Sequence, residues 1–96
     1  MHIGILQFTI NIPHAASLKD KRSVVRSMKD RIRRKFNVSI AEVDDHDTWN
    51  MATLGATMVG TDVGYINGAL SKLVDVLDEW REATLDDHQI EIINPK

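Results

Sequence analysis

Cysteine is absent from the 96 residues, which excludes a disulfide framework, a thiolate metal ligand and a cysteine nucleophile. No apolar run approaches the roughly 20 residues that a membrane-spanning helix needs. The opening stretch, MHIGILQFTINIPHAAS, lacks the basic segment of a signal peptide, and polar residues interrupt its apolar ones. We therefore expect a soluble, cytoplasmic protein without a membrane association. The length predicts one domain over residues 1–96.

The motifs of common enzyme classes are also missing. The sequence contains no G-x-S-x-G nucleophile elbow, no phosphate-binding P-loop and no H-E-x-x-H zinc motif. Acylphosphatases have the fold predicted below, but they carry a glycine-rich loop with an arginine where this chain has IPHAAS. We expect no enzymatic activity, no catalytic residue and no cofactor.

Hydrophobic periodicity predicts four strands and two helices. Residues 2–12 alternate as a strand, with Leu6, Phe8, Ile10 and Ile12 on one face. Further strands are predicted at 37–43, 48–60 and around 89–93, and helices at 17–35 and 62–82. The order β-α-β-β-α-β is typical of an α+β ferredoxin-like sandwich. This fold has a four-stranded antiparallel sheet, here in the order 4-1-3-2, with both helices on one face.

The first predicted helix concentrates the positive charge of the chain. Residues 17–36 hold nine of the twelve Lys and Arg residues and two acids, a net charge of +7, whereas the remaining residues carry −9. On a helical wheel, five cations fall within about 80° of one another, beside the apolar stripe. We name this set the basic lane: Lys19, Arg22, Arg26, Lys29 and Arg33. No acid lies within the lane, so we expect it to bind an anionic partner.

Positive charge also gathers at the start of this helix. Ser17 is the predicted N-cap, and Lys19, Lys21 and Arg22 follow at the end that the helix dipole makes positive. Together with the free backbone N–H groups, these side chains are predicted to hold a phosphate. The predicted partner is RNA or a ribosomal particle. Alternatively, acids of the second helix neutralise the first, or the partner is another acidic molecule. Lys21, on the apolar side, could also simply extend its charge to the surface.

The sheet lacks the aromatic residues with which RNA-binding proteins of this fold stack bases, so we expect the helix to carry any RNA contact. Its helix-free face is predicted instead to expose an apolar patch. The alternative function is therefore a homodimeric structural or scaffolding protein that associates through Ile3, Ile5, Val43, Trp49 and Met51. A shift of one residue in the strand register would turn these side chains inward.

The segment EVDDHDTW brings several acids and His46 together. Carboxylates bind divalent cations, but the segment has neither the spacing nor the glycine of a calcium-binding loop. Asp is common in tight turns, so we interpret residues 44–47 as a turn and predict no metal site.

Three motifs connect the chain to a known family: SLKDKR at 17–22, KFNVSIAEV at 35–43 and D-x-W at 47–49. In these the sequence resembles the YlxP-like family of small bacterial proteins, a domain of unknown function. The resemblance implies a ferredoxin-like fold. Genes of the family often lie near those for translation initiation factor 2 and a ribosome-binding factor, which implies RNA or ribosome association. The resemblance implies no catalytic residue.

Overall fold

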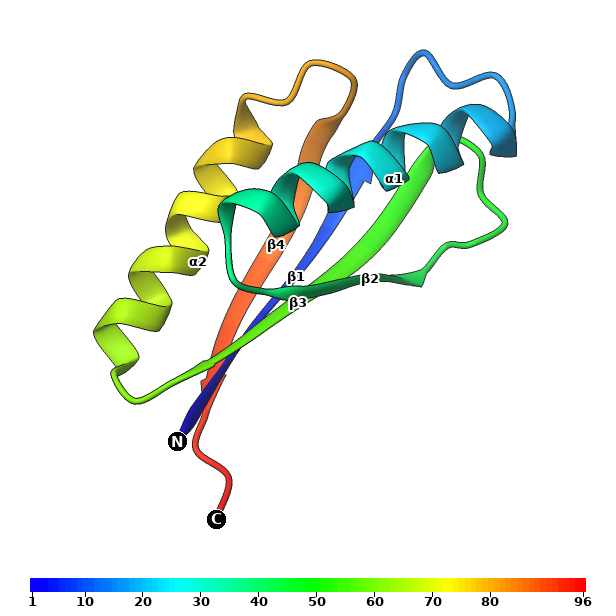
Figure 1. Ribbon diagram of the computed structural model, residues 1–96. Helices are drawn as coiled ribbons and strands as arrows, with labels where there is room; N and C mark the ends of the chain where they lie inside the picture. The colour runs from blue at the N-terminus through cyan, green and yellow to red at the C-terminus, as the bar shows by residue number, and fades with distance from the viewer.

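The computed structural model describes all residues, 1–96, and has the predicted topology (Figure 1). The elements follow in the order β1 (His2–Asn11), α1 (Leu18–Lys35), β2 (Ser39–Asp44), β3 (Met51–Gly60), α2 (Val63–Asp78) and β4 (Thr84–Ile93). The strands form one antiparallel sheet in the order β2-β3-β1-β4. Both helices cover the same face of this sheet (Figure 1). The predicted α+β ferredoxin-like fold and its strand order are confirmed.

The core fills the space between the sheet and the two helices. Side chains of β1 alternate, so that Leu6, Phe8 and Ile10 are buried against the helices while Gln7 faces away. On the same face Gly4 has no side chain because α2 passes directly over it: a β-carbon there would overlap Ile66. α1 packs over β2 and β3, whereas α2 packs over β1, β3 and β4. Neither helix combines the length and the apolar character that a membrane crossing requires.

Three predicted boundaries are wrong by more than two residues. α2 ends at Asp78 instead of residue 82, because the N–H groups of Glu79 and Trp80 turn back to Val76 and Leu77 and tighten the last turn. β3 begins at Met51 instead of residue 48, since residues 48–50 complete the turn after β2. β4 begins at Thr84, well before residue 89, and its first half is a polar, exposed edge segment that shows no apolar alternation.

Candidate nucleic-acid interface

The first turn of α1 is capped as predicted but does not form the predicted phosphate site. The backbone N–H of Asp20 donates to Ser17 Oγ at 3.1 Å, and the N–H of Ala16 donates to Asp20 Oδ2 at 2.9 Å. The carboxylate of Asp20 thus stands at the helix N-terminus, where the dipole favours an anion. It supplies there the negative charge that the phosphate was expected to bring, and Ser17 already serves as the cap.

Lys21 is fully buried, and the prediction that it binds an external anion is wrong. Its ammonium group lies 2.9 Å from Glu42 Oε2. It also donates to three backbone carbonyls, at 2.6 Å to Asp45, 3.2 Å to His46 and 3.1 Å to Met51. Four oxygens therefore share its three protons, and none is left for a ligand. Lys21 ties α1 to β2 and to the turn at residues 45–51.

The remaining cations of α1 lie outside, and the basic lane runs along the helix on the side of β2. Lys19, Arg22 and Arg26 are exposed and form no ion pair; Lys29 is half-buried. Arg33 donates from Nη2 to the carbonyl oxygen of Ile40 at 3.0 Å. Because Ile40 belongs to the edge strand β2, this bond places the lane over that edge of the sheet.

The acids of α2 do not neutralise the basic lane. The chain has two ion pairs, Lys21 with Glu42 and Arg33 with Asp30, and neither reaches α2. The second pair joins two exposed groups on one helix at 3.6 Å, a geometry that contributes little stability. α2 lies on the opposite flank of α1 from β2 (Figure 1). The lane therefore faces solvent with its charge largely uncompensated.

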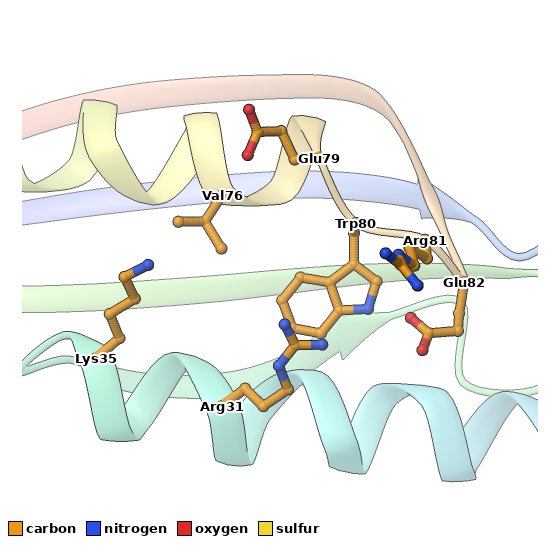
Figure 2. Close-up of a pocket in the computed structure, with 7 residues that line it drawn as sticks. All are labelled: Arg31, Lys35, Val76, Glu79, Trp80, Arg81 and Glu82. Carbon is orange, nitrogen blue, oxygen red and sulfur yellow. The ribbon is translucent and has the colours of Figure 1, made fainter.

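The flank of α1 that faces α2 holds a feature that the sequence analysis missed. A cavity of about 510 Å³ lies between the last turns of the two helices (Figure 2). Its lining includes Arg31 and Lys35 from α1, and Trp80 and Arg81 from the turn after α2. The guanidinium carbon of Arg31 lies 4.1 Å from the centroid of the Trp80 ring, a cation–π contact. In the sequence Trp80 lies at helical spacing from Leu77, which indicates a core position and gives no sign of this contact.

The acidic segment after β2 is a turn, and its side chains diverge. Asp45 adopts a left-handed backbone with φ 62°, a conformation that Asp tolerates in turns. Its Oδ2 accepts a hydrogen bond from Thr53 Oγ1 at 2.6 Å, while Asp44 and Asp47 are exposed. No three His, Asp or Glu side chains of the chain come close enough together to hold a metal ion.

The helix-free face of the sheet is not the continuous apolar patch that we expected. Ile3 and Ile5 lie on it, but the rows of Gln7 and Thr9 separate them from Met51 along β1 and β3. Of the other expected members, Val43 lies over Gly55, and Trp49 belongs to the turn before β3 and not to a strand. Ile3 instead pairs with the exposed Val59 and Ile93 across the sheet, which makes a smaller apolar group at the end near both termini.

Comparison with known proteins gives two matches over most of the chain. A family model described as "Protein of unknown function (DUF503)" matches residues 3–90. The chain is also similar to "Uncharacterized protein YlxP" of Bacillus subtilis (strain 168), with 32% identity over 80 residues. The match covers 83% of this chain and 87% of the relative.

Proposed function

This chain belongs to the DUF503 family of proteins of unknown function, and we propose that it is a non-enzymatic accessory protein that binds RNA through α1. The resemblance drawn from the sequence motifs is thereby confirmed at the level of the family. The proposed ligand is a structured RNA, free or within a ribosomal particle. The proposed contacts join its phosphates to the exposed part of the basic lane: Lys19, Arg22, Arg26 and Arg33.

One observation carries this proposal: most of the lane is exposed, and the one ion pair that reaches it is the exposed contact of Arg33 with Asp30. Lys19, Arg22 and Arg26 form no ion pair. Like charges on one helix face repel each other, and an anion bound along them relieves that repulsion. Glu42, an acid of the neighbouring strand β2, is already paired with the buried Lys21.

The shape of the lane favours phosphate contacts over reading of sequence. From Lys19 to Arg33 it extends about 21 Å along a straight helix, long enough to meet several phosphates of one duplex. Double-stranded RNA is recognised mainly by shape and by contacts to phosphates and 2′-hydroxyls. Arg supplies planar, bidentate donors to such oxygens. We therefore expect strong dependence on salt and weak dependence on RNA sequence.

A charge reversal with a matched control tests the proposal. Arg22→Glu/Arg26→Glu should abolish binding to an RNA hairpin and to ribosomal subunits, because both side chains are exposed and point away from the core. Lys72→Glu/Lys96→Glu changes the net charge equally at exposed positions outside α1 and should leave binding within a few-fold of wild type. Circular dichroism should show both variants folded. Equal binding by the two double variants would refute the lane as the RNA site.

A second candidate function is a homodimeric scaffold, and a specific observation favours it. Val59 and Ile93 are 64% and 38% exposed and flank Ile3 in one row of the helix-free face. A second copy of the chain could cover this group without touching α1, which lies on the other face of the sheet. Light scattering at high micromolar concentration would test it, and a monomer there would exclude it.

A further inference from the structure

We propose that the cavity between α1 and the end of α2 receives an unpaired base of the bound RNA, stacked on Arg31. This inference rests on the proposed RNA-binding function and names the kind of RNA that the protein prefers. It assigns a positioning role in base recognition to the pair formed by Arg31 and Trp80.

The pair, which we call the platform, lies at the wall of the cavity. Trp80 is 9% exposed, and its indole projects from the end of α2 toward α1 (Figure 2). The guanidinium of Arg31 lies over this ring, 4.1 Å from its centroid. Arg31 itself is exposed and lines the cavity, so its guanidinium is accessible to a ligand there. Unpaired RNA bases stack on aromatic rings and on guanidinium planes.

The polar groups around the platform suit a nucleotide better than a simple anion. The indole N–H of Trp80 points toward Arg81 and Glu82 (Figure 2). The lining combines three cations with two carboxylates, from Glu79 and Glu82. The cations can meet a phosphate, and the carboxylates can accept hydrogen bonds from the amino groups of a base edge. A bare phosphate would meet the repulsion of both carboxylates without using them.

The size and place of the cavity fit this ligand. Its volume of about 510 Å³ falls within the 300–1,000 Å³ typical of small-molecule sites. A second, shallower depression of about 320 Å³ lies on the outer surface of α1 and is lined by Arg26, Arg31 and Arg34 among others. Arg26 belongs to the basic lane, and Arg31 belongs to the cavity. Arg26, Arg34 and Arg31 thus connect the lane with the platform, although Asp30 and two serines share this surface. A strand held by the lane can place its next base at the platform.

The fluorescence of Trp80 tests the proposal directly. The chain has two tryptophans, so Trp49→Phe leaves Trp80 as the only indole. Titration with AMP should quench its emission, whereas ribose 5-phosphate and inorganic phosphate at the same concentrations should not. A hairpin with one bulged purine should quench it too, and a fully paired hairpin should not. Equal responses to AMP and ribose 5-phosphate, or no response to AMP, would overturn the proposal.

A conservative variant separates stacking from charge. Arg31→Lys retains the positive charge at an exposed position but removes the planar group. It should weaken binding of AMP and of the bulged hairpin by about 5- to 150-fold, the range for one lost stacked base. Binding of the paired hairpin should change by less than about twofold, because phosphate contacts persist. An unchanged affinity for AMP would refute the platform.

Failure of this inference can be told apart from failure of the proposed function. Arg22→Glu/Arg26→Glu should abolish binding of the paired hairpin but leave the AMP response of Trp80 in place. If the paired hairpin binds through the lane while AMP gives no signal, only the base site is wrong. If AMP binds while Arg22→Glu/Arg26→Glu weakens the binding of no RNA, the lane is not the RNA site. The cavity is then a nucleotide site independent of the lane.

Discussion

Replacing Lys21 by methionine should destabilise the protein more than any other single substitution of a cation in α1. The side chain is 0% exposed, and its ammonium group holds Glu42 and three carbonyl oxygens. Methionine fills a similar volume but donates no hydrogen bond. Glu42 Oε2 is buried and has no hydrogen-bond partner beyond this ion pair, so the variant leaves a charge without compensation.

The structure allows the magnitude to be worked out. Removing one partner of a buried ion pair costs about 3–5 kcal/mol. The free energy of unfolding of such a domain is about 5–15 kcal/mol, so the variant should still fold but near its limit. At 4–8 °C per kcal/mol, the midpoint of thermal unfolding should fall by roughly 12–40 °C. Lys21→Met/Glu42→Met removes the uncompensated charge as well and should recover part of the loss. The three carbonyls remain without a donor, so recovery should be incomplete.

Urea denaturation followed by circular dichroism measures these differences. Lys19→Met is the matched control, because Lys19 lies two residues earlier on the same helix and is exposed. It should change the free energy of unfolding by less than about 0.5 kcal/mol. If Lys21→Met were as mild as Lys19→Met, the buried ion pair would not hold α1 to the turn. If the double variant were less stable than Lys21→Met alone, the cost would not come from the charge of Glu42.

Two further predictions concern packing and assembly. Gly4→Ala should destabilise by about 1–3 kcal/mol in urea, because its new β-carbon would crowd α2, including Leu70 Cδ1 at 2.9 Å. A β-carbon at Gly68 would meet nothing within 4 Å, so Gly68→Ala should instead stabilise α2 by about 0.5–1 kcal/mol. Equal effects of the two substitutions on the free energy of unfolding would contradict the close approach of α2 to β1. Val59→Lys should convert any dimer to monomer in sedimentation equilibrium, whereas Trp49→Glu, in the turn before β3, should not. The reverse result would place the interface at the other end of the sheet.

Much of the fold could be predicted because local patterns agree with it. β1 has one buried face and one open face, so its apolar residues alternate along most of its length. The start of α1 is marked by Ser17, which caps it. Where a segment lacks such a pattern, the prediction failed. The first half of β4 is an exposed edge with Asp86, Asp87 and His88 in succession, so its pairing with β1 leaves no periodic signal.

The candidate site could be predicted only where its residues share one helix. The basic lane follows from the helical period alone, and its exposed members lie on α1. The position of Lys21 among buried residues of the same helix could indicate burial, but its oxygen ligands come from residues 21 to 30 positions away. The contact between Arg31 and Trp80 likewise joins two elements. It depends on α2 ending at Asp78, earlier than predicted, which places Trp80 in the turn after the helix. Such contacts depend on the packing of elements, which periodicity does not describe.

The salt dependence of RNA binding tests the central claim most directly. Affinity for one RNA hairpin is measured over a series of salt concentrations for wild type, Arg22→Gln and Lys72→Gln. Each lost phosphate contact lowers the log–log slope by about 1. We predict a slope smaller by that amount for Arg22→Gln, and a slope equal to wild type for Lys72→Gln, which lies on α2. Identical slopes for all three proteins, or no RNA binding at low salt, would contradict the proposal that α1 binds RNA phosphates.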